Sequence, residues 1–227
     1  YLKAARLFPG SPKPYIGLAN ILVQTGHLKE AVGLYEKAIG MDPGSAYVYC
    51  NLGFIYAKIG QVGKAIAMFD KALEIDPDYL KAYQGLSRIY QIKREADKLH
   101  ALYTKAIARK LAYFDAYYNI ANSYSEKGEY KKAIALYKKA IKINPGVGQG
   151  YFSLGRAYFA VKKDKESIEC FRKVITLDPK LAMAYGFIAI SYASQGKYSL
   201  AVSYCDKALE YGYRIDPQLL EFLKPYR

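Results

Sequence analysis

The chain has 227 residues, of which 34 are lysine or arginine and 20 are aspartate or glutamate, so its formal net charge is +14. No apolar run approaches the roughly 20 residues that a membrane-spanning helix needs, and Cys50, Cys170 and Cys205 lie far apart without CxxC spacing. These features argue against a membrane span, a disulfide framework and a zinc site within this sequence. The cysteines favour a reducing compartment such as the cytoplasm, although the residues alone leave the compartment open.

Tyrosine recurs along the chain with a strict period of 34 residues, at Tyr15, Tyr49, Tyr83, Tyr117, Tyr151 and Tyr185. Lysine keeps the same spacing at Lys37, Lys71, Lys105, Lys139, Lys173 and Lys207. Two series with one period indicate a single structural unit repeated six times.

The repeats divide the chain without an insertion. Residues 1–11 are expected to form the second helix of a preceding repeat, so that the chain would begin inside a longer protein. The six repeats then follow at 12–45, 46–79, 80–113, 114–147, 148–181 and 182–215. In the last segment, 216–227, Asp216 is expected to cap a short helix that begins at Pro217 and covers the final repeat.

Each repeat is predicted to be a helical hairpin. In repeat 46–79, apolar or small residues are spaced as on one face of a helix, and this happens twice: at Tyr49, Leu52, Gly53 and Tyr56, and then at Ala65, Ile66, Phe69, Ala72 and Leu73. Gly60 lies between the two helices and Pro77 follows the second, as turn and stop signals should.

Repeat 80–113 departs from the pattern. Arg94 replaces the turn glycine, Leu99 replaces a small residue, and Leu111 replaces the proline. We therefore expect the second helix of this repeat to run on toward the next hairpin with a bend at 110–114, and Leu99 to push its partner helix outward.

The pattern resembles the tetratricopeptide repeat (TPR) family, whose signature positions in repeat 46–79 are occupied by Tyr49, Leu52, Gly53, Tyr56, Gly60, Ala65, Phe69, Ala72 and Pro77. The resemblance implies an all-α fold, a right-handed superhelix of hairpins in which small residues such as Gly53 and Ala65 meet. It also implies that the first helix of each repeat lines a concave groove that holds a peptide or a helix of a protein partner.

The groove-facing positions can be read for each repeat on the basis of this resemblance. The first three repeats give a polar and net positive set: Lys13, Asn20, Gln24, Tyr47, Asn51, Phe54, Lys58, Lys81, Gln84 and Arg88. The last three give a more apolar set: Tyr118, Asn119, Asn122, Phe152, Arg156, Phe159 and Phe187. The positive half would suit an acidic peptide. Gly17, Gly85 and Gly186 on the groove side either let a partner's backbone come close or simply relax helix packing.

Some members of the family bind the C-terminal carboxylate of chaperones with a clamp of five residues. Asn20, Asn51 and Lys81 stand at three of the clamp positions, whereas Ile16 and Gly85 stand where a lysine and an arginine are needed. Arg88 lies close enough along the helix to substitute in part, because guanidinium pairs well with carboxylate.

No catalytic or cofactor-binding pattern is present. The two histidines, His27 and His100, have no neighbouring cysteine and no HExxH arrangement, so neither a metal site nor a charge relay is suggested. The sequence thus favours a non-catalytic scaffold that binds a protein or peptide. The alternatives are a self-assembling module that forms homo-oligomers, a co-chaperone-like adaptor with a carboxylate clamp, and an RNA-binding helical repeat, although the even spread of positive charge disfavours nucleic acid.

Overall fold

The computed structural model describes residues 3, 7–8 and 10–227. The helix expected within 1–11 therefore lies largely outside the described residues. Within them the chain forms thirteen α-helices and no β-strand, so the predicted all-α class is confirmed. The chain divides into two compact units, Tyr1–Leu111 and Ala112–Arg227.

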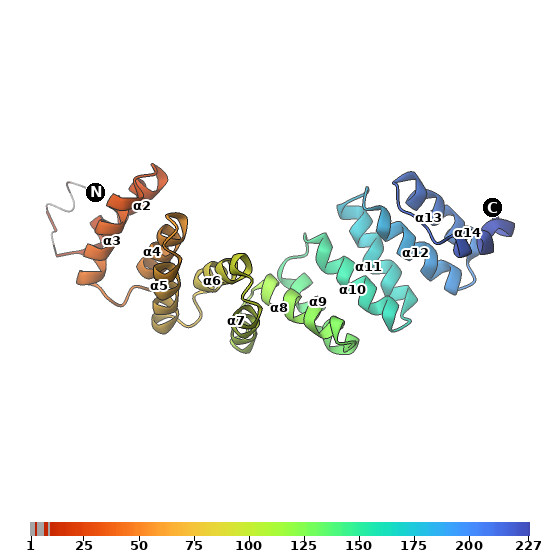
Figure 1. Ribbon diagram of the computed structural model, residues 1–227, viewed down its shortest axis with the longest axis horizontal. Coiled ribbons are helices and arrows are strands. Elements are labelled where there is room, and N and C mark those ends of the chain that lie inside the picture. Colours follow the sequence, from red (N-terminus) through yellow and green to blue (C-terminus); the bar gives the residue numbers. More distant parts are fainter. Residues whose placement is uncertain (1–2, 4–6, 9) are drawn as a thin grey trace. The chain divides into compact units, whose positions relative to one another are not determined.

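Unit 1 holds three helical hairpins that lie side by side in the order of the chain (Figure 1). They are α2 (Pro12–Gln24) with α3 (Leu28–Met41), α4 (Ala46–Lys58) with α5 (Val62–Ile75), and α6 (Leu80–Lys93) with α7 (Ala96–Ala108). The second helix of each hairpin contacts the next hairpin, because α3 packs against α4 and α5 packs against α6, and the first helix α4 also contacts α6.

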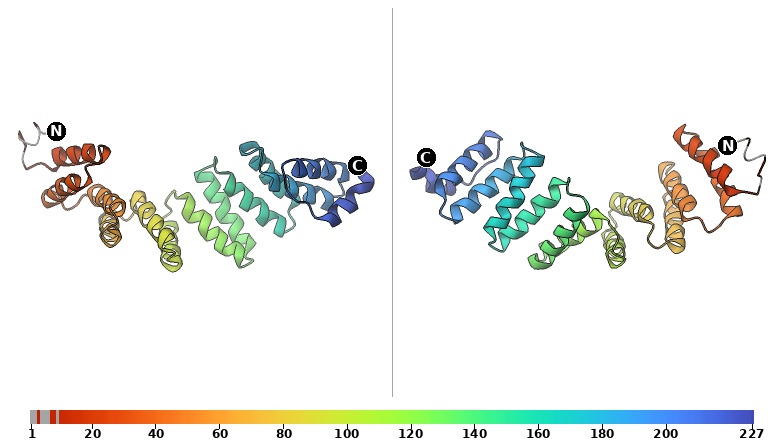
Figure 2. Two further views of the ribbon diagram at one scale, coloured as in Figure 1. Left: turned by 45° about the horizontal axis from the view of Figure 1, so that its top comes forward. Right: turned by 180° about the vertical axis from the view of Figure 1, so that it is seen from behind.

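Unit 2 repeats this arrangement and adds a short C-terminal helix (Figure 2). Its hairpins are α8 (Phe114–Glu126) with α9 (Tyr130–Ile143), α10 (Gly148–Ala160) with α11 (Asp164–Leu177), and α12 (Ala182–Ser194) with α13 (Tyr198–Glu210). Helix α14 (Pro217–Leu223) and a 3-10 turn (Lys224–Tyr226) follow.

The hairpins close where small residues face one another. The side chains of Ala19, Ala31, Ala121, Ala133, Ala189 and Ala201 are fully buried. At Gly53 a Cβ would lie 2.7 Å from the ring of Phe69. The absent side chain thus makes room for a phenylalanine of α5.

The turn inside every hairpin uses the left-handed backbone conformation. The four glycines at this position, Gly26, Gly60, Gly128 and Gly196, have φ angles of 85°, 80°, 75° and 73°. Arg94 and Lys162 occupy the same repeat position with φ of 57°. The turn therefore keeps its geometry in all six hairpins, although the side chains of Arg94 and Lys162 make the left-handed conformation less favourable in two of them.

The expectation that α7 continues toward the next hairpin is wrong. Helix α7 ends at Ala108, and Lys110 adopts a left-handed φ of 59°. The amide of Lys110 donates to the Ile107 carbonyl at 2.9 Å, and that of Leu111 donates to the Ala106 carbonyl at 3.1 Å. This is the Schellman pattern that ends a helix. Helix α13 ends in the same way at Gly212, where the amide of Tyr213 donates to the Ala208 carbonyl at 2.8 Å.

Helices α6 and α7 contact each other less extensively than the two helices of any other hairpin. This loosening agrees with the expected effect of Leu99, which stands where the other repeats have a small residue. The third hairpin is thus the most open one in the part of the chain that the structure describes.

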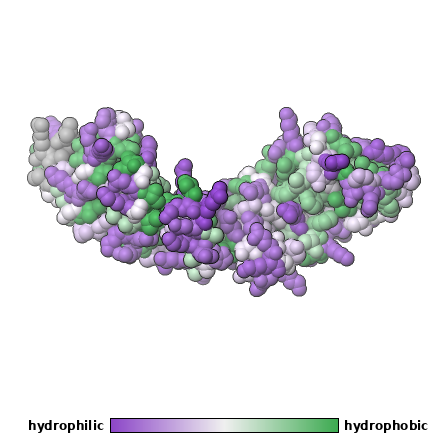
Figure 3. Space-filling model, in the orientation of Figure 1, coloured by the Kyte–Doolittle hydropathy of each residue, from purple (hydrophilic) through white to green (hydrophobic). Residues whose placement is uncertain are grey.

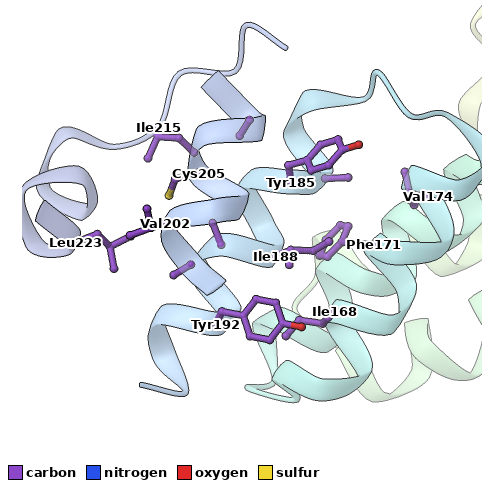
Figure 4. Packing of buried hydrophobic residues seen from close by; sticks show 14 residues of the cluster. Ile168, Phe171, Val174, Tyr185, Ile188, Tyr192, Val202, Cys205, Ile215 and Leu223 are labelled. Atoms are coloured by element: carbon purple, nitrogen blue, oxygen red, sulfur yellow. The ribbon is translucent and has the colours of Figure 1, made fainter. Parts of the chain in front are cut away.

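The core of unit 2 shows how neighbouring hairpins are joined. Phe171 of α11 and Ile188 of α12 are fully buried and face each other between the helices (Figure 4). Leu223 of α14 reaches the same cluster, and Leu219 and Leu220 pack against it. The Asp216 side chain accepts a hydrogen bond from the Gln218 amide at 2.9 Å, so the predicted cap and its helix are confirmed.

Candidate functional site

A hollow of about 360 Å³ with both polar and apolar lining residues lies on unit 1 among α2, α3 and α4. Six of the ten residues that line it belong to the groove positions predicted from the sequence: Asn20, Gln24, Tyr47, Asn51, Phe54 and Lys58. The first helices of two successive repeats thus bring their predicted residues to one surface.

Asn20 is held at this hollow by two tyrosine hydroxyls. Tyr35, which is buried on α3, donates to the Asn20 Oδ1, and Tyr47 of α4 donates to the same oxygen at 3.1 Å. Burial raises the pKa of Tyr35 to about 12, with a further contribution from Tyr47, while a hydrogen bond from Asn51 opposes the shift. The phenol therefore stays protonated, and the N–H groups of Asn20 remain available to an acceptor on a ligand.

A second hollow, of about 570 Å³ and more polar than the first, lies on unit 2 among α8, α9, α10 and α12. Its lining includes five predicted groove residues: Tyr118, Asn122, Arg156, Phe159 and Phe187. These five residues bring three aromatic rings, the Arg156 guanidinium and the Asn122 amide to one surface.

Asn122 is positioned as Asn20 is. The hydroxyl of Tyr137, buried on α9, donates to the Asn122 Oδ1 at 2.7 Å. Asn122 and Tyr137 stand three repeat periods after Asn20 and Tyr35. Burial raises the pKa of Tyr137, so this phenol also stays a donor. The same amide-holding device therefore occurs in both units.

The aromatic side of the unit 2 hollow is one connected cluster. Phe187 stacks on Phe171 with ring centroids 4.8 Å apart, and Phe159 and Phe152 meet its ring edge to face at 5.5 and 5.9 Å. Phe171 is fully buried. The exposed edges of Phe159 and Phe187 are thus braced from behind by the core.

A third hollow, of about 550 Å³, is more apolar and lies on unit 1 between α4 and α6. It adjoins the first hollow, because Phe54 and Lys58 line both. The remaining lining residues are Ala57, Val62, Phe69, Gly85, Arg88, Ile89, Ile92 and Lys93. In Figure 3, apolar residues reach the surface among hydrophilic ones in both units.

Five predicted groove residues do not line a hollow. Lys13, Lys81 and Gln84 are exposed on α2 and α6. The Asn119 amide donates to the carbonyl of Asp115 on its own helix at 2.8 Å, and Phe152 is half-buried in the aromatic cluster.

Reasoning from the sequence missed the second-helix tyrosines. Tyr35 and Tyr137 each follow an asparagine of the first helix by 15 residues, and this repeated pairing was the available signal. Ile92 was missed because it falls outside the positions that the family resemblance assigns to the groove, although 73% of its surface is exposed.

The space beside two glycines is already occupied. A Cβ at Gly85 would lie 2.3 Å from the ring of Phe69, and one at Gly186 would lie 2.5 Å from the ring of Tyr213. The reading in which these glycines admit a partner's backbone is therefore wrong, and both serve helix packing.

The described residues include no cluster of histidine, cysteine and acidic side chains that could hold a metal ion. Cys50 and Cys170 are buried, and burial raises the pKa of each thiol to about 12. Both therefore stay protonated, and neither is activated as a nucleophile. Every helix at the described positions is too short or too polar to span a lipid bilayer.

Family models match most of the repeats, and four of the matched segments begin at the first residue of α4, α8, α10 or α12. Models described as "Tetratricopeptide repeat" match residues 46–79 and 114–147, and residues 148–181 and 182–211. A model described as "TPR repeat" matches residues 19–60. No curated protein matches the sequence.

Solved structures of TPR proteins share the fold. YrrB, described as a TPR protein with an unusual peptide-binding site, is 24% identical with a TM-score of 0.63, over 84% of this chain and 97% of that one. A tetratricopeptide repeat protein from Parabacteroides merdae is 19% identical with a TM-score of 0.57, over 95% and 84%. The C-terminal part of a TPR repeat-containing protein from Cytophaga hutchinsonii is 21% identical with a TM-score of 0.58, over 86% and 78%. The repeat register, the helical hairpins and these matches together show that the chain belongs to the tetratricopeptide repeat family.

Proposed function

We propose that this chain is a non-catalytic scaffold that binds an extended peptide of a protein partner along the inner faces of its first helices. TPR arrays generally serve protein–protein interaction, and YrrB, which shares the fold, is described as having a peptide-binding site. In this chain the support comes from the hollows, because eleven of the predicted groove residues line the first two of them.

The observation that carries the proposal is the pair of asparagines fixed by buried tyrosines. Asn20 and Asn122 each accept a tyrosine hydroxyl through Oδ1, which leaves the N–H groups as donors for a ligand. A peptide presents backbone carbonyls whatever its sequence, so such donors suit an extended chain. The carboxamide is pre-oriented by the phenol, which lowers the entropy lost on binding.

The aromatic rings beside each asparagine would supply side-chain contacts. Tyr47 and Phe54 are about two-fifths exposed at the unit 1 hollow, and the edges of Phe159 and Phe187 line the unit 2 hollow. Aromatic residues are frequent anchors at protein interfaces. In this proposal the amides set the register of the peptide and the rings select its apolar side chains.

The test begins with selection of binding peptides from a displayed random library, using the intact chain as bait. Selected peptides are then measured against the double variant Asn20→Ala with Asn122→Ala. We expect the affinity to fall by about tenfold or more, since each lost hydrogen bond contributes roughly 0.5–1.5 kcal/mol.

Asn119→Ala is the matched control, because the Asn119 amide is already bonded to its own helix. It should leave the affinity unchanged. Circular dichroism of all variants establishes that the helices persist. A library that yields no binder, or binders indifferent to the double variant, would contradict the proposal.

A further inference from the structure

The apolar hollow between α4 and α6 presents large hydrophobic side chains to solvent. Ile92 is 73% exposed and Phe54 is 41% exposed at its edge, while Phe69 and Ile89 form a buried floor. The Phe54 ring meets the Phe69 ring edge to face at 4.9 Å between centroids. Its volume of about 550 Å³ is within the range of sites that take a ligand.

The packing around Phe69 makes this floor firm. The ring is fully buried and lies against two glycines, since a Cβ at Gly53 or at Gly85 would come within 2.7 or 2.3 Å of it. Neither helix can close further over the hollow, because the phenylalanine already fills the space beside both backbones. The opening is thus a consequence of well-packed residues.

Positive charge surrounds the opening. Lys58, Arg88 and Lys93 line the hollow, and none of its lining residues is acidic. The ammonium of Lys93 pairs with Glu95 at 2.7 Å, whereas no ion pair involves Lys58 or Arg88 anywhere in the described chain. One ammonium on α4 and one guanidinium on α6 therefore remain available to carboxylates.

From this juxtaposition we propose that the hollow is a subsite for an acidic peptide segment in which a bulky apolar side chain lies between acidic residues. The apolar side chain enters against Ile92, Phe54 and the floor, and its flanking carboxylates meet Lys58 and Arg88. Arginine can bind a carboxylate through two parallel hydrogen bonds. This subsite rests on the proposed function and specifies the chemical class of the partner.

The probe is a fluorescently labelled short peptide with a central Asp-Leu-Phe-Glu in a Gly-Ser background, titrated against the intact chain by fluorescence polarisation. Two companion peptides replace Leu-Phe by Ser-Ser or the acidic residues by lysine. We expect only the parent peptide to bind, and its affinity to fall as salt is raised, because the charges at the rim are exposed.

Ile92→Asp tests the apolar contact and Arg88→Glu tests the charge. Each change should lower the affinity for the parent peptide by about tenfold or more, because each removes one contact and places a negative charge beside a carboxylate of the peptide. Arg88→Glu combined with Lys58→Glu should in turn bind the lysine-substituted peptide better than the native chain does. Leu200→Asp and Lys131→Glu, at exposed positions of unit 2, are matched controls without effect.

The outcomes separate this subsite from the broader function. If library-selected peptides lose affinity in the asparagine double variant but not with Ile92→Asp or Arg88→Glu, the acidic subsite is wrong and the scaffold function stands. If the parent peptide binds equally well to all variants, or does not bind at all, the subsite is likewise overturned. If no library peptide binds the chain, both proposals fail.

Discussion

Six turn residues at one repeat position have positive φ, but only four of them are glycine. At Arg94 and Lys162 the folded state is destabilised, because a residue with a side chain adopts the left-handed conformation unfavourably. We predict that Arg94→Gly and Lys162→Gly each raise the free energy of unfolding, by about 0.5–1 kcal/mol. Urea unfolding followed by circular dichroism measures this, and Gly128→Ala, the reverse change at an equivalent turn, should lower stability by a similar amount. Lower stability of either glycine variant would contradict the assignment.

Phe69 depends on the absence of a side chain at Gly85. Gly85→Ala places a Cβ 2.3 Å from the ring of Phe69. We therefore predict that overpacking lowers the free energy of unfolding by about 1–3 kcal/mol. Gly63→Ala is the control on the neighbouring helix, where a Cβ meets nothing within 4 Å, and it should be neutral or stabilising. Combining Gly85→Ala with Phe69→Leu should cost less than the sum of the single changes. Additive costs would show that the two sites are independent.

Buried thiols make stability depend on alkaline pH. Burial raises the pKa of Cys50 and of Cys170 from 9.0 to about 12. Below pH 9 both states keep the proton, but at higher pH the unfolded chain loses it first, so stability falls as the pH rises toward about 12. Unfolding midpoints measured from about pH 8 to about pH 11 should therefore decline, and Cys50→Ala with Cys170→Ala should flatten the decline. An unchanged slope in the double variant would assign the pH effect to other groups.

At the scale of elements, α14 closes the apolar end of the last hairpin. Leu223 is 1% exposed within the core cluster of unit 2. We predict that Leu223→Ala lowers the free energy of unfolding by about 2–4 kcal/mol, because it leaves a cavity. Asp216→Ala should lower it by about 1 kcal/mol, because the helix cap is lost. Gln218→Ala, which keeps the capped backbone amide and alters only an exposed side chain, should be neutral. Thermal unfolding of the three variants tests these predictions. A Leu223→Ala variant as stable as the native chain would contradict the role of α14 as a cap on the last hairpin.

The helical hairpins could be predicted from the sequence because the packing code is local and repeats every 34 residues. The end of α7 could not, since this repeat has neither a glycine nor a proline to mark where its second helix stops. Lys110 shows that a residue with a side chain ends a helix in the left-handed conformation when two backbone hydrogen bonds compensate it. A local pattern thus predicts which segments are helical more reliably than how a degenerate repeat ends.

The candidate site could be predicted in part. Periodicity assigns Asn20 and Asn122 to the first helices, but their amides are oriented by Tyr35 and Tyr137 of the second helices, and such orientation depends on tertiary packing. The same limit applies to Asn119, whose position suits the groove although its amide bonds to its own helix. Repeat register therefore locates candidate residues, whereas neighbouring helices decide which of them are free to bind.

At the scale of the whole molecule, the proposed function resides in surfaces built by successive hairpins. The hollow of about 360 Å³ on unit 1 lies between α2 and α4, and the hollow of about 570 Å³ on unit 2 lies among α8, α10 and α12. In the proposed function, such a surface binds its partner through many modest contacts and needs no activated side chain. The first helices supply most of its residues, while the second helices supply the tyrosines that hold them.

Photo-crosslinking of a library-selected peptide to the intact chain, mapped by mass spectrometry, tests the central claim most directly. The peptide carries a benzophenone at successive positions in separate experiments. We predict crosslinks on the first helices, with Asn20 among the nearest residues for a peptide on α2, α4 and α6 of unit 1, and Asn122 for a peptide on α8, α10 and α12 of unit 2. Crosslinks confined to the exposed sides of the second helices would contradict the account.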